Sequence, residues 1–106
     1  MTALTPAQQL ALVMTRIYDA GMTTLSGGNV SIRERDGSLW VTPRGLDKSC
    51  LTADTIAHVL PDGTVEGAYQ PSTELPFHRA IYTRRPDVSA IVHPHDDRVA
   101  VLGVGD

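Results

Sequence analysis

Apolar and polar positions alternate with two different periods along this chain, and the change of period separates helices from strands. Leu10, Val13 and Ile17 recur at a spacing of three or four residues, which predicts an amphipathic helix. The segment Thr5-Pro6-Ala7-Gln8 places a capping hydroxyl before a proline and closes a capping box with glutamine, which is the pattern of a helix start. We expect the helix to stop at Gly21.

The next part of the chain favours strands. Short apolar runs come in pairs, and each pair is joined by a glycine-containing turn sequence that is typical of a β-hairpin. The two predicted hairpins comprise residues 30–35 and 39–42 around Asp36-Gly37-Ser38, and residues 56–60 and 64–66 around Pro61-Asp62-Gly63.

The last third of the chain returns to helix and then to strand. A helix is predicted from a cap at Ser72 to about Arg84. Residues 88–93 form an apolar, β-branched run that indicates a buried strand. A last helix, capped within Asp96-Asp97, is expected to run through Val101. The order αββββαβα, with antiparallel hairpins, predicts a layered α+β domain.

Composition narrows the class of protein. The 106 residues contain 9 Lys and Arg against 12 Asp and Glu, a net charge of −3, and 42% are hydrophobic. This is enough for the core of one domain or of part of one. The basic residues form no tract, which argues against a nucleic-acid partner. No apolar run is long enough for a membrane span, no signal peptide is evident, and the single cysteine, Cys50, fits a reducing compartment, so we expect a cytoplasmic protein.

The most informative motif is His93-Pro94-His95 at the end of the predicted strand 88–93. Two imidazoles at i and i+2 on a strand project from the same face, and imidazole is a common ligand of divalent transition metals. The alternative is a pair of histidines that happens to end a strand. A two-histidine site also lacks the usual third protein ligand, so we expect the domain to be incomplete.

A carboxylate upstream adds acid/base chemistry to this hypothesis. Glu74 falls near the start of the predicted second helix, where a carboxylate is also favoured simply by the helix dipole. His78 follows one turn later and is expected to be a hydrogen-bonded structural histidine rather than a ligand. His58, on a predicted hairpin strand, is expected to be structural or exposed. Metal ligands combined with one free carboxylate suggest catalysis rather than a structural zinc site.

Three short segments could bind an anion. Ser26-Gly27-Gly28-Asn29 and Thr42-Pro43-Arg44-Gly45 combine small residues with hydroxyl, amide or cationic groups, and Ser72-Thr73 lies at a predicted helix N-terminus. Taken singly, each is equally an ordinary connector, turn or cap. Taken together, they indicate a phosphate cradle.

Several motifs resemble, in order and spacing, the N-terminal part of the class II aldolase/adducin family, from about Thr5 to Val101. The matching stretches are Gly28-Asn29-Val30-Ser31-Ile32-Arg33, Val41-Thr42-Pro43-Arg44-Gly45, Leu51-Thr52-Ala53-Asp54, Val65-Glu66-Gly67, Pro71-Ser72-Thr73-Glu74-Leu75-Pro76-Phe77-His78, Ile81-Tyr82, Arg85-Pro86-Asp87-Val88 and Ala90-Ile91-Val92-His93-Pro94-His95.

The resemblance implies an α/β/α layered sandwich around a mainly antiparallel sheet, with residues 1–106 as the N-terminal part of one incomplete domain. It implies that His93 and His95 are two of three histidine ligands of Zn²⁺ or another divalent metal, and that Glu74 is the catalytic acid/base. It also implies a homotetramer with active sites between subunits. The positions implied around the phosphate of a small-molecule substrate are Ser26, Gly28, Asn29, Thr42, Gly45, Ser72 and Thr73.

The implied activity is that of a metal-dependent aldolase-type lyase, which cleaves a carbon–carbon bond of a sugar phosphate or related hydroxy-carbonyl compound through an enediolate. The third histidine of the family comes from the second half of the domain, and Pro94 and Asp96 depart from the family's usual His-Thr-His-Ser segment. The alternatives are an epimerase, dehydratase or decarboxylase of the same family, a non-catalytic adducin-like assembly module, and a truncated product that folds poorly.

Overall fold

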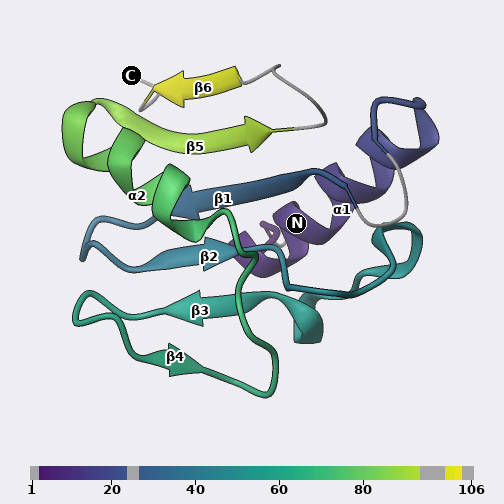
Figure 1. Ribbon diagram of the computed structural model, residues 1–106, viewed down its shortest axis with the longest axis horizontal. Coiled ribbons are helices and arrows are strands. Elements are labelled where there is room, and N and C mark those ends of the chain that lie inside the picture. Colours follow the sequence, from purple (N-terminus) through teal and green to yellow (C-terminus); the bar gives the residue numbers. More distant parts are fainter. Residues whose placement is uncertain (1–2, 24–26, 94–99, 104–106) are drawn as a thin grey trace.

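A six-stranded antiparallel sheet organises the chain, as seen in a computed structural model that describes residues 3–23, 27–93 and 100–103 (Figure 1). The strand order is β4-β3-β2-β1-β5-β6, so β1 is a central strand between β2 and β5. The strands are β1 (Asn29–Arg33), β2 (Leu39–Val41), β3 (Ala57–Val59), β4 (Val65–Glu66), β5 (Val88–His93) and β6 (Ala100–Gly103). Both predicted hairpins are confirmed, as β1–β2 and β3–β4.

The two faces of the sheet are covered by different helices. Helix α1 (Pro6–Asp19) lies behind the sheet and helix α2 (Leu75–Arg84) crosses in front of it (Figure 1). Short 3-10 turns at Lys48–Cys50 and Ala53–Thr55 lead from β2 into β3. The predicted α+β class, with helices on both faces of an antiparallel sheet, is therefore confirmed.

Alternation along β1 sends side chains into both layers, as expected for a strand. Val30 and Ile32 pack with α1, whereas Ser31 and Arg33 reach α2 through hydrogen bonds. The core on the α1 side contains Ala7, Leu10, Ala11, Met14, Ile17, Val30, Leu51 and Ile56. The core on the α2 side contains Leu39, Val41, Val59, Tyr82, Val88 and Ile91.

The start of α1 agrees with its sequence signature. The Gln8 amide N–H donates to Thr5 Oγ1 (3.1 Å), and the Thr5 amide N–H donates to Gln8 Oε1 (2.9 Å), which completes the predicted capping box. The helix ends at the C-cap Ala20, and Gly21 follows at φ +74°. Glycine adopts this left-handed conformation without the steric cost that a side chain would add.

The start of α2 differs from the prediction. Glu74 is the N-cap and Leu75 the first helical residue, whereas Ser72 had been predicted as the cap. Ser72 instead joins the loop before α2 to the end of β2, because its amide N–H donates to the Thr42 carbonyl (2.9 Å). Its hydroxyl still serves the helix start by accepting from the Glu74 amide N–H (3.1 Å).

The predicted last helix through Val101 is wrong. Residues 100–103 form β6, which pairs antiparallel with β5 in the registers Ile91–Val101 and Val92–Ala100. The backbone groups on the outer side of β5 need partners, and a neighbouring strand supplies a continuous ladder of them. The suggested caps Asp96 and Asp97 lie outside the described residues.

A buried hydrogen-bond network joins α2 to β1. Ser31 Oγ lies 2.6 Å from His78 Nδ1 and 2.7 Å from the Tyr82 hydroxyl, and both Ser31 and His78 are fully buried. Burial, with a smaller contribution from nearby His93, lowers the pKa of His78 from 6.5 to about 4. Burial also raises the pKa of Tyr82 to about 12. Near neutral pH, His78 is therefore a neutral imidazole and Tyr82 keeps its proton.

Arg33 holds the other end of α2. Its guanidinium donates to the backbone carbonyls of Tyr82 (2.8 Å), Arg85 (3.0 Å) and Pro86 (3.0 Å), and it also reaches that of Val88. It lies 4.7 Å from the centre of the Tyr82 ring, within range of a cation–π contact. One side chain of β1 thus satisfies carbonyls where α2 ends and β5 begins.

Replacing Arg33 by methionine should lower the free energy of unfolding by about 2–3 kcal/mol, because several carbonyls lose a charged donor at once. Denaturant titration monitored by circular dichroism measures the change. Arg33→Lys is the matched control, since it retains the charge and some donors, and its loss should be smaller. Equal stability of the wild type and Arg33→Met would contradict the role of this contact.

Acid should weaken the fold through His78. The unfolded chain binds a proton at this imidazole below its ordinary pKa of 6.5, but the folded chain does so only near 4. Stability is therefore complete above 6.5 and decreases as the pH falls toward 4. Between about pH 7 and about pH 5 the loss due to this group should be about 2 kcal/mol.

The control is His78→Gln, which does not titrate at this position. Chemical denaturation of both proteins at the two pH values should show a steeper loss for the wild type. The same pH dependence in both would exclude His78 as the source.

Candidate functional site

Three loops enclose a small cavity beside the N-terminus of α2. It has a volume of about 220 Å³, and it is lined by Gly27, Gly28, Asn29, Pro43, Arg44, Gly45, Ser72, Thr73 and Glu74. Six of the residues predicted from the sequence as site residues meet here, namely Gly28, Asn29, Gly45, Ser72, Thr73 and Glu74. The structure thus brings together segments that lie far apart in the sequence.

Backbone hydrogen bonds hold these loops side by side. The Arg44 amide N–H donates to the Gln70 carbonyl (2.9 Å), and the Ser72 amide N–H donates to the Thr42 carbonyl (2.9 Å). Pro43 and Pro71 form an isolated antiparallel bridge between these two contacts. The segment before α2 therefore runs along the end of β2 and carries Ser72, Thr73 and Glu74 to the turn at Gly45.

Thr42 is not among the residues that line the cavity. Its side chain is fully buried, and its Oγ1 accepts from the Val30 amide N–H (3.2 Å). The threonine therefore joins the beginning of β1 to the end of β2. The part of Thr42 that touches the loop before α2 is its carbonyl, which receives the Ser72 N–H.

The lining of the cavity suits an anion. Arg44 supplies the positive charge, Ser72 and Thr73 supply hydroxyls, and the first turn of α2 follows directly after Glu74. Gly28 at φ +77° and Gly45 at φ +76° adopt a conformation that side chains disfavour. Arg44, named in the sequence only as part of a turn, is the cationic residue among those that line the cavity.

Asn29 connects this cavity to the inside of the protein. It begins β1, is 5% exposed, and pairs in register with His93 of β5. Its Oδ1 is hydrogen-bonded to His78 Nε2. Since an amide oxygen can only accept, the imidazole donates through Nε2. His78 is thus the hydrogen-bonded structural histidine that the sequence predicted.

His93 ends β5 on the face of the sheet that α2 covers. Its ring lies 5.2 Å from that of Phe77, measured between centroids and tilted by 42°. Phe77 belongs to the first turn of α2, and Glu74 is the cap of the same helix. The imidazole of His93 and the exposed carboxylate of Glu74 therefore belong to neighbouring ends of two packed elements.

Two predicted site residues, Ser26 and His95, lie outside the described residues. Within residues 3–23, 27–93 and 100–103, no three His, Cys, Asp or Glu side chains gather as a metal-binding group. The metal-ligand roles of His93 and His95, like the catalytic role of Glu74, stay predictions.

The other candidate groups have structural surroundings. The His58 ring stacks on Trp40, with centroids 3.9 Å apart and planes 3° from parallel, and its Nδ1 contacts Glu66 Oε1 at 2.9 Å. This agrees with the expected structural role of His58. Cys50 is exposed at the end of a 3-10 turn.

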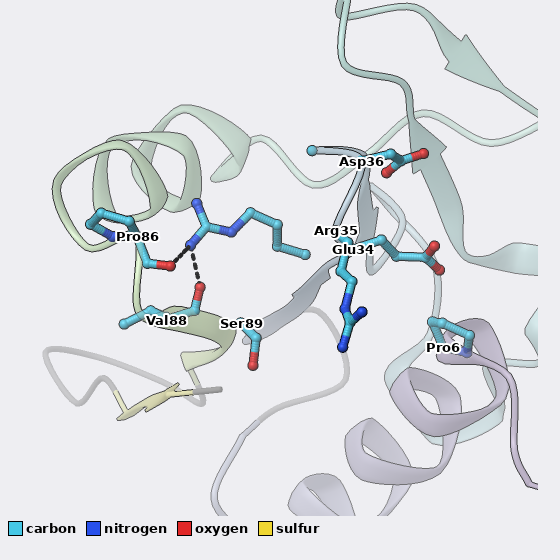
Figure 2. Close-up of a pocket in the computed structure, with 9 residues that line it drawn as sticks. Pro6, Glu34, Arg35, Asp36, Pro86, Val88 and Ser89 are labelled. Carbon is cyan, nitrogen blue, oxygen red and sulfur yellow. Dashed lines mark hydrogen bonds between the residues drawn. The ribbon is translucent and has the colours of Figure 1, made fainter. Parts of the chain in front are cut away.

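A larger cavity, of about 920 Å³, lies at the opposite end of β1 (Figure 2). Its wall includes Glu34, Arg35 and Asp36 after β1, Pro6 at the start of α1, and Val88 of β5. The dashed lines in Figure 2 end on the carbonyls of Pro86 and Val88, which accept hydrogen bonds from the guanidinium of Arg33. None of the predicted site residues lines this cavity.

Within the described part of the chain, no helix combines the length and apolar character needed to cross a membrane.

Comparison with known proteins shows which family the chain resembles. Residues 8–105 match the family described as Class II Aldolase and Adducin N-terminal domain. The chain is 42% identical to L-fuculose phosphate aldolase of Escherichia coli strain K12 over 84 residues, which cover 79% of this chain and 37% of that protein. It is 31% identical to 3-oxo-tetronate 4-phosphate decarboxylase of Haemophilus influenzae over 106 residues, which cover 100% of this chain and 50% of the relative.

Solved structures that resemble this fold include an aldolase of the same kind. A solved L-fuculose 1-phosphate aldolase superposes with a TM-score of 0.80 at 29% identity, over 92% of this chain and 47% of that structure. The chain thus spans half or less of the length of these three relatives. The family match covers nearly all of its residues. The chain therefore belongs to the class II aldolase/adducin family.

Proposed function

We propose that the protein containing this chain is a metal-dependent lyase that cleaves a carbon–carbon bond of a small phosphorylated hydroxy-carbonyl compound. The observation that carries the proposal is the convergence of Glu74, Arg44 and the hydroxyls of Ser72 and Thr73 on one cavity. That cavity shares Asn29 with the end of β5, where His93 lies. A cavity whose lining would suit an anion, a carboxylate and an imidazole are thereby carried by adjoining elements.

The cavity would hold the phosphate of the substrate. A phosphate oxygen accepts hydrogen bonds and carries negative charge, so it complements Arg44, the hydroxyls of Ser72 and Thr73, and the N–H groups around Gly28 and Gly45. Binding at this remote group would orient the rest of the molecule toward Glu74 and His93. Such orientation lowers the barrier of the chemical step.

A divalent metal, with Zn²⁺ as the first choice, would be held by His93 and His95 together with a ligand from outside this chain. The donor set fits such an ion, because His93 carries an imidazole to the end of β5 beside the first turn of α2, whereas His78 is used by internal hydrogen bonds. When bound, the metal supplies a Lewis acid that stabilises negative charge developing on substrate oxygens.

Glu74 would transfer the proton at the carbon where the bond breaks. Its carboxylate is exposed and lines the cavity, and as the N-cap of α2 it is anchored by the backbone. The Glu74 amide N–H donates to Ser72 Oγ (3.1 Å), so the acid/base residue and a phosphate-binding hydroxyl are tied to each other. A general acid/base must reach both substrate and solvent, which this position allows.

A decarboxylase is the second candidate. The relative from Haemophilus influenzae that is aligned with the whole chain acts, by its name, on 3-oxo-tetronate 4-phosphate as a decarboxylase. Both reactions break a carbon–carbon bond next to a group that can take up the electron pair, so one phosphate cavity and one cation could serve either. Epimerase and dehydratase reactions of the same family, or a non-catalytic adducin-like assembly role, are the remaining alternatives.

We further propose that the whole protein forms a homotetramer and acts on a small molecule in the cytoplasm. The single cysteine, Cys50, supports a reducing compartment such as the cytoplasm. The balance of 9 basic against 12 acidic residues favours a small-molecule partner over a nucleic acid.

In the full-length protein, Glu74→Gln should lower turnover by about 100-fold or more, because an amide cannot exchange the proton. Metal content should be unchanged, since histidines would hold the ion. Steady-state kinetics with a ketose phosphate, paired with elemental analysis, tests both statements. Glu66→Gln, outside the cavity, is the matched control and should retain activity. Loss of metal in Glu74→Gln would make Glu74 a ligand, and unchanged turnover would remove it from the reaction.

Arg44→Gln should weaken binding of inorganic phosphate to the full-length protein by about 10-fold, because one charged donor is lost. The affinity of the wild type should also fall with added salt, and that of the variant less so. Isothermal titration calorimetry at low and high salt gives both quantities. Arg79→Gln, exposed on α2 and away from this cavity, controls for the change in net charge. The same loss in both variants would refute a specific contact.

A further inference from the structure

The phosphate cavity is connected to the core by a chain of buried hydrogen bonds. Asn29 lines the cavity with one side and is bonded through Oδ1 to His78 Nε2. His78 Nδ1 is 2.6 Å from Ser31 Oγ, which is 2.7 Å from the Tyr82 hydroxyl. Asn29, Ser31, His78 and Tyr82 are all at most 5% exposed. The direction in which donors point along this chain decides which end of the Asn29 amide faces the cavity.

The direction follows from the buried hydroxyl of Tyr82. Ser31 Oγ is the partner of that hydroxyl among the residues that the structure describes, so the Tyr82 proton is donated to Ser31. Ser31 then donates its own proton to His78 Nδ1, and the neutral imidazole donates through Nε2 to Asn29 Oδ1. If His78 Nδ1–H donated to Ser31 instead, either the Tyr82 proton or the Ser31 proton would be buried without an acceptor among the side chains described around it, which is unfavourable.

We propose that His78, supported by Ser31 and Tyr82, is a positioning residue that turns the Asn29 amide so that its NH₂ group faces the phosphate cavity. The inference rests on the proposed function, because it assigns the selectivity of the same cavity. With Oδ1 held by His78, Asn29 presents donors and no acceptor on the cavity side.

This arrangement selects ligands by their hydrogen-bonding character. An ionised phosphate offers acceptors to the Asn29 NH₂ group, whereas a turned amide would present an oxygen that repels it. The cavity should therefore prefer a phosphorylated compound to the same compound ending in a hydroxyl. Asn29 makes the contact that enforces this preference, and its orientation is set by His78, Ser31 and Tyr82, which do not line the cavity.

The test compares two amide replacements of His78 in the full-length protein. In His78→Gln the longer side chain places an NH₂ group near the position of Nε2, so it can still donate to Asn29. In His78→Asn the amide ends near the position of Nδ1, so it keeps the contact with Ser31 but not that with Asn29. Both variants are neutral, and thermal unfolding without ligand reports their stability separately.

Phosphate affinity by calorimetry should fall by about 10-fold in His78→Asn, the size of one lost bond to a charged group, and by less than about threefold in His78→Gln. The NMR signals of the Asn29 side-chain NH₂ should shift with added phosphate in the wild type and in His78→Gln only. In steady-state kinetics, His78→Asn should raise KM more than it lowers kcat.

Equal affinities of His78→Asn and the wild type, while Asn29→Ala loses binding, would overturn the positioning role and leave the phosphate cavity intact. Equal losses in both His78 variants would also overturn it, because stability alone would then account for them. If the wild type bound no phosphate, the proposed function and this inference would both fail.

Discussion

The buried hydroxyl of Ser31 fixes the position of α2 on the sheet, and the rest of the structure depends on that contact. This hydroxyl lies fully buried in the middle of the central strand β1, on a face that elsewhere packs Leu39, Val41 and Ile91. A polar group in such surroundings is tolerated only with hydrogen-bond partners, and both partners come from α2. Apolar packing alone would let the helix slide along the sheet. His78 and Tyr82 instead define one position and one register, and Arg33 holds the end of the helix two residues further along β1.

That single register has consequences at the surface. When α2 is held by Ser31, its cap Glu74 comes to the end of the sheet where β1 begins and β5 ends. The loop before the helix then reaches the turn at Gly45, and the cavity closes around Asn29. The candidate site is therefore assembled by the same contact that unites the two layers. Stability and proposed function share these residues, so a substitution here should be measured for both.

Much of the candidate site could be predicted from the sequence, because the groups involved have recognisable chemistry. Five of the residues expected near a phosphate line one cavity together with Glu74, which was expected beside them as the acid/base. The five are Gly28, Asn29, Gly45, Ser72 and Thr73. Thr42 was expected with them, but its hydroxyl accepts a hydrogen bond from the Val30 amide. Nothing in the local sequence indicates this contact, because the two residues lie 12 positions apart. The network of Ser31 and Tyr82 left no local signal either. Ser31 stands between two apolar residues of a strand, and this pattern alone predicts a solvent-facing serine. Its burial becomes evident only when the helix that covers it is known.

The sequence by itself determined the elements whose rules are local. The capping box at Thr5, the glycine stop at Gly21 and the two hairpins depend on residues within a few positions of one another. Tertiary structure alone decided the rest. Residues 100–103 became β6 because the outer side of β5 needed backbone partners, and α2 began at Leu75 because Ser72 was already bonded to Thr42. These outcomes depend on hydrogen bonds between segments distant in the chain, whose pairing is set only when the whole sheet has formed.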